Sequence, residues 1–565
     1  MYRQEHPNPQ AKRQGWRNLN GTWEFDFDFG KSGKERRLYE GGELTKHIEV
    51  PFCPESPLSG IGHRDFIPAV WYRRHFSLSE KELEGRVLLH FGAVDYLATV
   101  YINGRELGRH RGGFSSFTFD ITDASQVGEN VLTVYAEDDT RSPEVPSGKQ
   151  SPFYNSRDCV YTRTTGIWQT VWLEFVPNGH IASFRLYPDA ANGTLRIQAS
   201  VRGAGILRAE ATYGGKPMGA VEKAAQNGSC DLEIALTERH LWEIGNGRLY
   251  DLVLTFGEDR VESYFGLRSV CFDGRRFLLN GKSVFQRLVL DQGFYPDGVY
   301  TAPSEEALIQ DIELSQAVGF DGARLHQKVF EPLFLYHCDR LGYIVWGEYP
   351  NWELNITRPE GIFAILPEWL EVVERDFNHP SIVTWCPFNE TWNSAGAMRD
   401  TQRCIYRATK ATDPTRPCVD TSGGFHTEAT DFYDTHDYEQ DPDIFRARYD
   451  ALMTEGKLWD RWEKEQRWDG KMPYCMSEYG GIRWSDDKAS WGYGKTPESE
   501  EEFYSRFKGL TDALLDNDMI FSLCYTQLYD VEQEQNGLYT YERKPKFKDM
   551  EFFRKVMTRK AKIEE

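Results

Sequence analysis

The sequence predicts a multidomain protein in which two consecutive all-β domains precede a (β/α)8 barrel. Three observations support this fold class. The chain has 565 residues, too many for one hydrophobic core, so about three or four domains are expected. Its first half alternates apolar and polar residues in short runs, whereas its second half alternates strand-like with helical runs. These patterns predict domains over residues 1–177, 178–270 and 271–565.

The first predicted domain consists of short strands separated by turns. Its alternating runs cover residues 21–27, 70–76, 87–91, 98–102 and 130–136. Asn103-Gly104 follows one of these runs and favours a tight hairpin turn. The pattern is typical of an antiparallel β-sandwich. Similar runs continue in the second predicted domain, whose length of about ninety residues suits an immunoglobulin-like sandwich.

From residue 271 onward, strands and helices alternate, which predicts a parallel sheet with crossover helices. Ser304 is expected to cap the first helix, and Pro332 and Pro367 are expected in the first turns of the next two. Strand candidates follow at residues 283–290, 320–324, 343–346, 382–386, 417–421, 432–435, 473–477 and 520–525. Eight strands close a barrel.

Composition excludes several classes of partner. The net charge is −21, from 87 acidic against 66 basic residues, so nucleic acid and anionic membranes would be repelled. No apolar run reaches the roughly 18 residues of a membrane span, and the segment from Met1 to Pro9 lacks the apolar core of a signal peptide. The ten cysteines show no Cys-x-x-Cys spacing. We therefore expect reduced thiols in a cytoplasmic protein.

Two glutamates stand where barrel chemistry is usually found. Glu390 follows the fourth predicted strand, and Glu478 follows the seventh. The C-terminal ends of all barrel strands face one pocket, so these residues can meet there. Two carboxyl groups about 5–5.5 Å apart are the machinery of a retaining glycosidase, one as nucleophile and one as general acid/base. The alternative is that both glutamates close their strands as solvated acids.

Three motifs resemble glycoside hydrolase family 2. They are Trp385-x-x-x-Asn389-Glu390, the later Ser477-Glu478-Tyr479-Gly480, and the segment from Arg163 to Glu174, which matches the closing strand of the family's N-terminal domain. The resemblance covers nearly the whole chain. It implies a sugar-binding-like β jelly roll, then an immunoglobulin-like β-sandwich, then a catalytic TIM barrel.

The resemblance also implies roles for individual residues. Glu390 is expected to be the general acid/base and Glu478 the nucleophile. Asn389 matches the family asparagine that binds the sugar 2-hydroxyl, and Tyr438 matches the tyrosine that hydrogen-bonds the nucleophile. His436 or Asp437, beside that tyrosine, is the alternative inward group.

Other pocket residues are expected at the ends of strands one to four. Arg324 can donate to the nucleophile and keep its pKa low. His326 is its companion, although one residue separates the two where better-known family members have two. Asp291 and Glu348 can each accept hydrogen bonds from sugar hydroxyls or serve as structural partners of neighbouring groups. Trp385 is expected at the pocket floor.

Neither a cofactor nor a metal is expected, since hydrolysis by two carboxyl groups needs neither. His436, Asp437 and Glu439 lie close in sequence but lack a recognisable metal-binding spacing. The expected partner is a small oligosaccharide or glycoside. A homo-oligomer remains open.

The leading functional hypothesis is an exo-acting retaining β-glycosidase of neutral sugars, most like a β-galactosidase. The β-glucuronidase pattern places Asn-x-Lys before Gly-Ile-Phe-Thr to hold the uronate. The corresponding stretch here, residues 532–540, has no lysine and two nearby glutamates, Glu532 and Glu534. Lys328 is the basic residue that could reach the pocket from strand two and bind a uronate carboxylate. β-Glucuronidase, β-mannosidase and α-L-arabinosidase stay open, as does a non-catalytic carbohydrate-binding protein.

Overall fold

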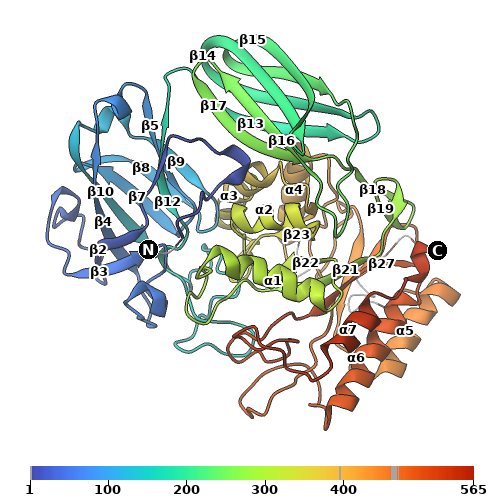
Figure 1. The fold of residues 1–565 in the computed structure, drawn as a ribbon. Coiled ribbons are helices and arrows are strands. Elements are labelled where there is room, and N and C mark those ends of the chain that lie inside the picture. Colours follow the sequence, from blue (N-terminus) through green and yellow to red (C-terminus); the bar gives the residue numbers. More distant parts are fainter. Residues whose placement is uncertain (1–2, 393–395, 460–467, 469) are drawn as a thin grey trace.

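A computed structural model of the chain describes residues 3–392, 396–459, 468 and 470–565. Three domains are visible in Figure 1: a β-rich N-terminal domain at the left, a β-sandwich at the top, and a barrel with its helices at the centre and right. The predicted order of jelly roll, immunoglobulin-like sandwich and TIM barrel is therefore confirmed.

Two antiparallel sheets form the jelly roll. The smaller sheet has the order β1 (Trp16–Asn18), β12 (Val171–Val176), β5 (Arg86–Phe91) and β9 (Phe117–Asp120). The larger has the order β3 (Lys46–Val50), β2 (Gly21–Phe27), β4 (Ala69–Leu78), β10 (Gly128–Glu137), β7 (Leu97–Ile102) and β8 (Arg105–Arg111). A short pair, β6 (Val94–Asp95) and β11 (Gly166–Ile167), lies beside them. Alternation along strands such as β5 buries every second side chain in the core between the sheets.

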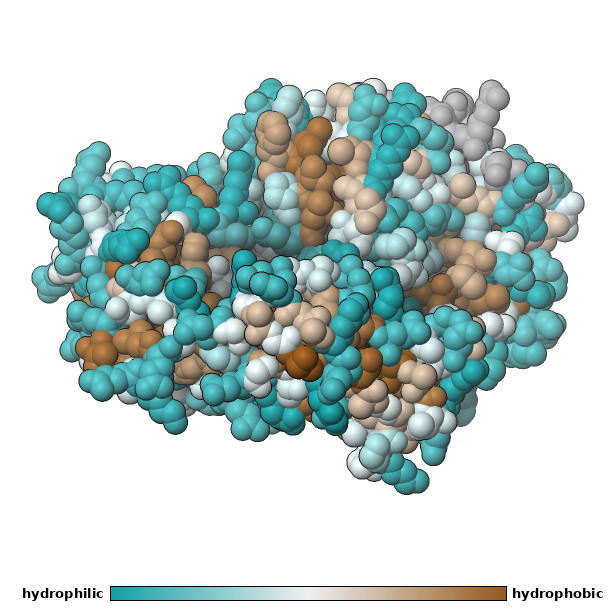
Figure 2. All heavy atoms as spheres, turned by 90° about the horizontal axis from the view of Figure 1, so that it is seen from above, coloured by the Kyte–Doolittle hydropathy of each residue, from teal (hydrophilic) through white to brown (hydrophobic). Residues whose placement is uncertain are grey.

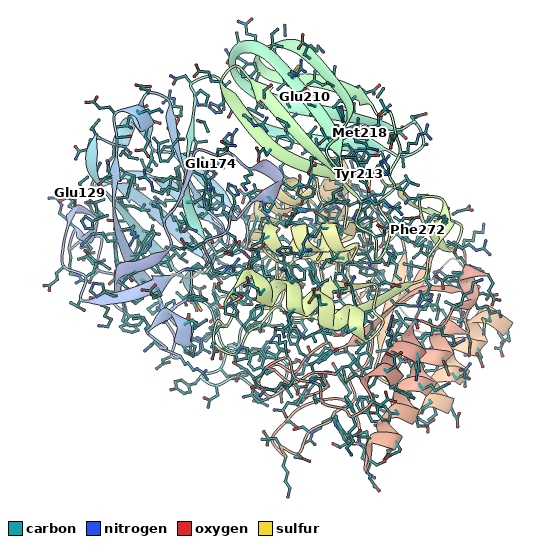
Figure 3. All side chains as sticks on the ribbon, in the orientation of Figure 1. Glu129, Glu174, Glu210, Tyr213, Met218 and Phe272 are labelled. Atoms are coloured by element: carbon teal, nitrogen blue, oxygen red, sulfur yellow. The ribbon has the colours of Figure 1, made fainter. Side chains whose placement is uncertain are left out.

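The second domain contains β13 (His180–Asp189), β14 (Thr194–Tyr213), β15 (Lys216–Ala235), β16 (Leu249–Phe256) and β17 (Asp259–Gly266). β14 and β15 pair along nearly their whole length. The first half of β14 also pairs with β13 and its second half with β16, on either side of an irregularity between Val201 and Ala204. One bent strand thus serves both halves of the sandwich. Figure 3 labels Glu210, Tyr213 and Met218 on these long strands.

The N-terminal segment ties the two β domains together. Arg13 donates 2.9 Å hydrogen bonds to Glu174 of the jelly roll and to Asp259 of the sandwich. Glu174 is labelled in Figure 3 on the jelly-roll side. The two carboxylates are largely buried, so this paired arginine compensates the cost of their burial.

A small sheet of β18 (Val270–Asp273), β19 (Arg276–Leu279) and β20 (Lys282–Ser283) leads into the barrel. The parallel barrel strands are β21 (Gln286–Asp291), β22 (Gly322–Leu325), β23 (Ile344–Glu348), β24 (Ile382–Cys386), β25 (Tyr433–Asp437), β26 (Tyr474–Gly480) and β27 (Ile520–Thr526). Their order is β24-β23-β22-β21-β27-β26-β25.

One predicted barrel strand, residues 417–421, is only partly formed. It makes isolated parallel bridges beyond β24, between Trp385 and Cys418 and, just after it, between Asn389 and Ser422. Side chains take backbone donors that a neighbouring strand would otherwise use: the Cys418 N–H donates to Asp431, and the Asp420 N–H donates to Thr430. A continuous ladder to β25 is therefore replaced by local hydrogen bonds.

Within the described residues there are seven α-helices: α1 (Glu305–Ala317), α2 (Pro332–Leu341), α3 (Pro359–Asp376), α4 (Gly396–Thr412), α5 (Pro442–Glu455), α6 (Glu500–Leu515) and α7 (Met550–Met557). Ser304 caps α1, and Pro332 opens α2, as predicted. The prediction for Pro367 is wrong, because α3 begins at Pro359 and continues past it. Its buried face of Ile365, Trp369 and Val373 stabilises the helix across the proline.

Figure 2 shows a mostly hydrophilic surface on the face seen from above, with hydrophobic side chains in separate patches. Across the described residues, no helix combines the length and apolarity that a membrane crossing requires. All ten cysteines are free thiols.

Candidate active site

The two predicted catalytic glutamates meet at the C-terminal end of the barrel strands. Glu390 lies four residues beyond β24, where its N–H donates to Ser422 O at 2.8 Å. Its backbone is left-handed, with φ of +51°, which a glutamate rarely adopts and which is common at functional sites. Glu478 lies within β26, which extends beyond the predicted strand end at residue 477.

His436, at the end of β25, lies between the two carboxyl groups. Its Nδ1 is 2.8 Å from Glu390 Oε1 and 3.3 Å from Glu478 Oε2. One oxygen of each glutamate and one nitrogen of His436 all lie within 4.8 Å of one another. A Cβ on Gly423, at φ of +63°, would lie 2.2 Å from the imidazole, so a glycine is required there. The carboxyl spacing fits a nucleophile and an acid/base, with no room for the water of an inverting enzyme.

Arg324, on β22, holds Glu478 in its ionised state. Its Nη1 donates to Glu478 Oε1 at 2.8 Å, and the Tyr438 hydroxyl donates to the other carboxylate oxygen. Burial disfavours the charged carboxylate, yet the charges of His436 and Arg324 lower the pKa of Glu478 to about 2. A nucleophile needs this ionised form.

Asn389 offers a free donor to the pocket. Its Oδ1 accepts from Arg324 Nη2, while its Nδ2 is buried and has no hydrogen-bond partner among the described residues. An unmet buried donor costs about 1–3 kcal/mol, so a ligand oxygen at this position would restore the lost hydrogen bond. This arrangement suits the expected contact with a sugar 2-hydroxyl.

His326 also lies in this cluster. Its Nδ1 is 3.0 Å from Arg324 Nη2 and 3.1 Å from Glu348 Oε1. Burial and the nearby charges of Lys149 and Arg324 lower its pKa well below the usual range. His326 is therefore neutral at physiological pH.

Asp291 lies at the end of β21 and takes the structural one of its two expected roles. It is 1% exposed, and its carboxylate accepts from the Tyr529 hydroxyl and from Gly293 N at 2.9 Å. Its neighbours are Asp311 and Arg543, and not the catalytic pair. Asp291 is a structural partner at the first strand end.

Glu348 takes the structural one of its two expected roles, whereas Trp385 does not lie where it was expected. The Glu348 side chain is fully buried and is the second counter-ion of Arg324, at 2.6 Å. Trp385 is not the pocket floor: its indole donates to Asp413 at 2.8 Å and contacts Trp369 of α3 edge-on. Strand β24 is buried on both faces, so its apolar residues can face the helix layer as well as the barrel interior.

Lys328 does not reach the pocket. Its Nζ donates to the backbone carbonyls of Gly293 and Tyr300 and lies among aromatic rings. Burial lowers its pKa to about 7. It cannot serve as a substrate cation from this position.

A different cation, Lys149, enters the pocket from the jelly roll. Its loop lies against the barrel, with Ser147 N donating to Trp352 O at 3.1 Å. A Cβ on Gly148, at φ of +55°, would lie 2.5 Å from Gln327 O, so only glycine allows this approach. The Lys149 ammonium lies 3.9 Å from the centroid of the Trp352 ring. Burial opposes its charge, but Cys159, Glu534 and both catalytic glutamates raise its pKa.

Glu534 lies opposite this lysine. It follows β27 and accepts hydrogen bonds from the Tyr161 hydroxyl of the jelly roll and from Asn536 Nδ2. Burial raises its pKa, while Lys149 opposes that rise. Its 2% exposure places it inside the protein. Lys149 and Glu534 thus influence each other's pKa at the seam between the two domains, without a direct ion pair.

Tyr493 completes the surroundings of the nucleophile. Its ring stacks on Tyr438 with centroids 3.4 Å apart and planes 3° from parallel. Sequence reasoning did not identify Tyr493, Lys149 or Glu534 as site residues. Glu534 was noted only as an acid in the stretch from Glu532 to Asn536. No local sequence pattern indicated a site role for Tyr493 or Lys149.

A cavity of about 430 Å³ opens beside Glu390. It is lined by Asn351, Trp352, Glu353, Leu354, Ile356, Glu390, Thr391, Trp392 and Met398. Another cavity of about 440 Å³ lies between the immunoglobulin-like domain and the barrel, far from the carboxyl pair in its lining residues.

Three family models match the chain in order. A "Glycosyl hydrolase 2 galactose-binding domain-like" model covers residues 64–167, a "Glycosyl hydrolases family 2" model covers 179–268, and the family's TIM barrel model covers 273–506. The chain belongs to glycosyl hydrolase family 2. The prediction that it is a glycoside hydrolase is confirmed at this level.

Family 2 relatives carry different activities in their names. A β-glucuronidase from Streptococcus agalactiae is 23% identical over 96% of both chains. A β-galactosidase from Aeromonas hydrophila is 28% identical over 73% of this chain, and a putative β-glucuronidase from Formosa agariphila is 27% identical over 57%. This chain spans only 41% and 40% of those two relatives' lengths.

Solved structures of the family share the fold. A β-glucuronidase from an uncultured Clostridium superposes with a TM-score of 0.82 at 20% identity, over 97% of this chain and 99% of its own. This similarity supports the fold. It does not identify the substrate, which depends on the residues of the pocket.

The family 2 site contains a trio of metal-ligand types, namely Glu390, His436 and Glu478. Two of these are the carboxyl groups that glycoside hydrolysis needs. Arg324 and Tyr438 already engage the oxygens of Glu478, which leaves this trio poorly suited to a cation.

Proposed function

We propose that this family 2 chain is an exo-acting retaining β-glycosidase that removes a terminal neutral sugar, most like a β-galactosidase. The observation that carries the proposal is the paired arrangement of Glu390 and Glu478 about His436 within 4.8 Å. Jelly-roll residues also approach the barrel near this pair, with the Tyr161 hydroxyl donating to Glu534 and the catalytic glutamates acting on the charge of Lys149, which supports a pocket for one terminal sugar.

The first chemical step uses both carboxyl groups at once. Protonated Glu390 transfers its proton to the glycosidic oxygen while a Glu478 oxygen attacks the anomeric carbon. The bond to the leaving group breaks, the leaving group departs as an alcohol, and a covalent glycosyl-enzyme remains. Asn389 Nδ2 is free to donate to the 2-hydroxyl as positive charge develops on the sugar ring.

The second step reverses these roles. Ionised Glu390 removes a proton from water, and the water oxygen attacks the anomeric carbon from the face that the leaving group vacated. Glu478 is released as a carboxylate, which Arg324 and Tyr438 stabilise. Two inversions at one carbon retain the anomeric configuration.

The charges around the pocket favour a neutral sugar. Arg324 and Lys149 carry positive charge, while Glu348, Glu478 and Glu534 are carboxyl groups besides the acid Glu390. A sugar carboxylate would add another negative charge to this cluster, and an unpaired buried charge costs several kcal/mol. Sugar hydroxyls, in contrast, can donate to Glu534 and accept from Lys149.

A second candidate, a β-glucuronidase, is favoured by Lys149 itself. Its ammonium makes a cation–π contact with Trp352 but no ion pair with a carboxylate of the described residues. It could therefore hold a sugar carboxylate that the residue 532–540 stretch has no lysine to bind. Several relatives are named β-glucuronidases.

A panel of nitrophenyl glycosides at neutral pH distinguishes these candidates. We expect kcat/KM for the β-galactoside to exceed that for the β-glucuronide by at least about a hundredfold, or roughly 2.7 kcal/mol. The panel includes the β-mannoside and the α-L-arabinoside. Comparable values for galactoside and glucuronide would favour the second candidate, and no turnover of any glycoside would contradict the proposal as a whole.

The variant Lys149→Met shows which group this lysine holds. If it binds a hydroxyl, kcat/KM for the neutral glycoside should fall about tenfold, as for one lost hydrogen bond to a charged group. If it binds a carboxylate, the glucuronide should lose far more than the neutral glycoside. Lys282→Met, at an exposed lysine on β20, is the matched control and should change neither.

A further inference from the structure

We propose that the cavity between the immunoglobulin-like domain and the barrel binds a small organic anion, with the anionic group at Arg268. The cavity volume of about 440 Å³ falls within the roughly 300–1,000 Å³ range of ligand pockets. In Figure 1 the sandwich lies above α3 and α4, the helices that precede the barrel residues of this cavity. The catalytic carboxyl pair is not among its lining residues, so the site is independent of the sugar that the enzyme accepts.

Arg268 is a buried arginine without a carboxylate partner. It follows β17 and is 8% exposed. Its Nε donates to Pro380 O at 2.9 Å and its Nη2 to Ile382 O at 2.8 Å. Within the described part of the chain, no carboxylate pairs with this guanidinium, and its Nη1 makes no hydrogen bond. Backbone carbonyls offset only part of a buried charge, so an anion at Nη1 would be favourable.

Arg416 brings a second positive charge next to the first. The two guanidiniums donate to the same carbonyl oxygen, that of Ile382, each at 2.8 Å. Asp413 pairs with Arg416 Nη1 at 2.5 Å. Burial and the charge of Arg416 lower the pKa of Arg268 to about 9. The cluster therefore holds two guanidiniums and one directly paired carboxylate, which leaves an excess of positive charge beside the cavity.

Other acids near this cluster are engaged elsewhere. Asp339 accepts from the Tyr264 hydroxyl at 2.8 Å and is also bound by histidine and backbone nitrogens. Asp189, in the cavity lining, accepts from two backbone N–H groups of its own turn. Glu233 lines the cavity from an exposed position on β15. The excess charge of Arg268 thus remains for a ligand to pair with.

The rest of the lining suits an apolar body on that anion. Tyr187, Pro188 and Ala190 line the cavity from the sandwich and are partly exposed. Arg196, on β14, lies over the Tyr187 ring at 4.1 Å and is 3.5 Å from Asp231, beyond good hydrogen-bond distance. A ring carboxylate would bury this apolar surface and accept from a second guanidinium. An inorganic anion would gain only the charge contacts.

Isothermal titration calorimetry of the full chain with benzoate tests the site. Benzamide provides the ring without the charge, and inorganic phosphate provides the charge without the ring. We expect one benzoate per chain, bound at least about tenfold more tightly than either comparison compound, because only benzoate makes both kinds of contact. All titrations use one ionic strength, since salt screens a partly exposed charge pair.

Variants assign the binding to this cavity. Arg268→Gln should raise the benzoate Kd by about a hundredfold, because it removes the buried partner of the anion. Arg196→Gln changes an exposed side chain, so it should fold even where a variant of buried Arg268 does not, and should raise Kd by about threefold or more. Ala191→Glu adds a negative charge at the exposed turn of the lining and should do the same.

Two matched controls lie on the same domain. Arg260→Gln removes an exposed arginine of β17 that pairs with Glu262, and Ala224→Glu adds a charge on exposed β15. Neither residue lines the cavity, so both variants should leave Kd unchanged. Lys149→Met should also leave it unchanged, which separates this cavity from the active site, where a lysine can attract the same anion.

Three results would overturn the inference. They are the absence of saturable benzoate binding, binding of benzamide or phosphate as tight as that of benzoate, and binding that Lys149→Met abolishes while Arg196→Gln leaves it unchanged. Glycoside turnover is not part of this measurement. A failure of the proposed sugar specificity is therefore a separate outcome.

Discussion

Arg324 Nη1 donates to Glu478 Oε1 across 2.8 Å, and solvent reaches almost nothing of either side chain. The same guanidinium binds Glu348 through Nε at 2.6 Å and Asn389 through Nη2. The Arg324 side chain therefore positions the nucleophile Glu478, its second counter-ion Glu348, and Asn389, which precedes the acid Glu390. Because the charge-assisted contacts favour ionised Glu478, they oppose the desolvation cost of burying it.

Replacing Arg324 with Met should raise the acid limb of the pH–rate profile. Burial already disfavours ionised Glu478, and the variant removes one of the charges that lower its pKa to about 2. The limb should move to higher pH while kcat falls by about a hundredfold or more. Arg448→Met, at an arginine paired with Asp437, should leave the limb in place. An unmoved limb in an active Arg324→Met enzyme would show that Arg324 does not tune the nucleophile.

Glu478 should also make stability depend on pH. Its pKa is about 2 in the folded state against an ordinary value of 4.5, so its ionised form stabilises the fold. This contribution is complete above about pH 4.5 and is lost as the pH falls toward about 2. Relative to Glu478→Gln, the wild type should lose about 3 kcal/mol of unfolding free energy over that range, measured by urea denaturation. Parallel curves for the two proteins would contradict the depressed pKa.

Asn389 should act through the substrate 2-hydroxyl. Asn389→Ala should lower kcat/KM about a hundredfold for a glycoside with that hydroxyl, and less than about fivefold for its 2-deoxy analogue. The reason is that Nδ2 is a buried donor without a partner among the described residues. Asn103→Ala, in a jelly-roll turn, is the control. Equal losses on both substrates would show that Asn389 acts only through the position of Glu390.

The placement of the catalytic pair could be predicted from the sequence because both glutamates follow strongly apolar barrel strands. Strand order alone then brings them to one face. Trp385 could not be placed in this way, since β24 is buried on both faces and its sequence does not tell pocket from helix layer. Asp291 and Glu348 are acids at strand ends, and only their buried partners distinguish them from ligand-binding groups.

The position of Lys149 in the site could not be predicted from sequence patterns, for a different reason. It lies in an irregular loop of the jelly roll, and its position depends on packing between domains through Gly148 and Trp352. Periodicity describes elements within a domain and carries no information about such contacts. The fifth strand, predicted at residues 417–421, is only partly formed because the side chains of Thr430 and Asp431 replace its ladder with local hydrogen bonds.

The first-formed sugar should keep the anomeric configuration of the substrate. Carboxyl oxygens within 4.8 Å match the nucleophilic spacing and fall short of the roughly 6.5–9.5 Å that admits a water. Proton NMR of the reaction mixture in its first minutes, before mutarotation, reads this directly. A product of the opposite anomeric form would rule out the two-step mechanism.

The stereochemistry of azide rescue tests the central assignment most directly. Glu478→Ala and Glu390→Ala should each lose most activity, and azide should restore turnover of a glycoside with a good leaving group. In Glu478→Ala, azide takes the place of the nucleophile and should give the glycosyl azide of inverted configuration. In Glu390→Ala, azide attacks the glycosyl-enzyme and should give the retained one. The same azide configuration from both variants would contradict the assignment of Glu478 as nucleophile and Glu390 as acid/base.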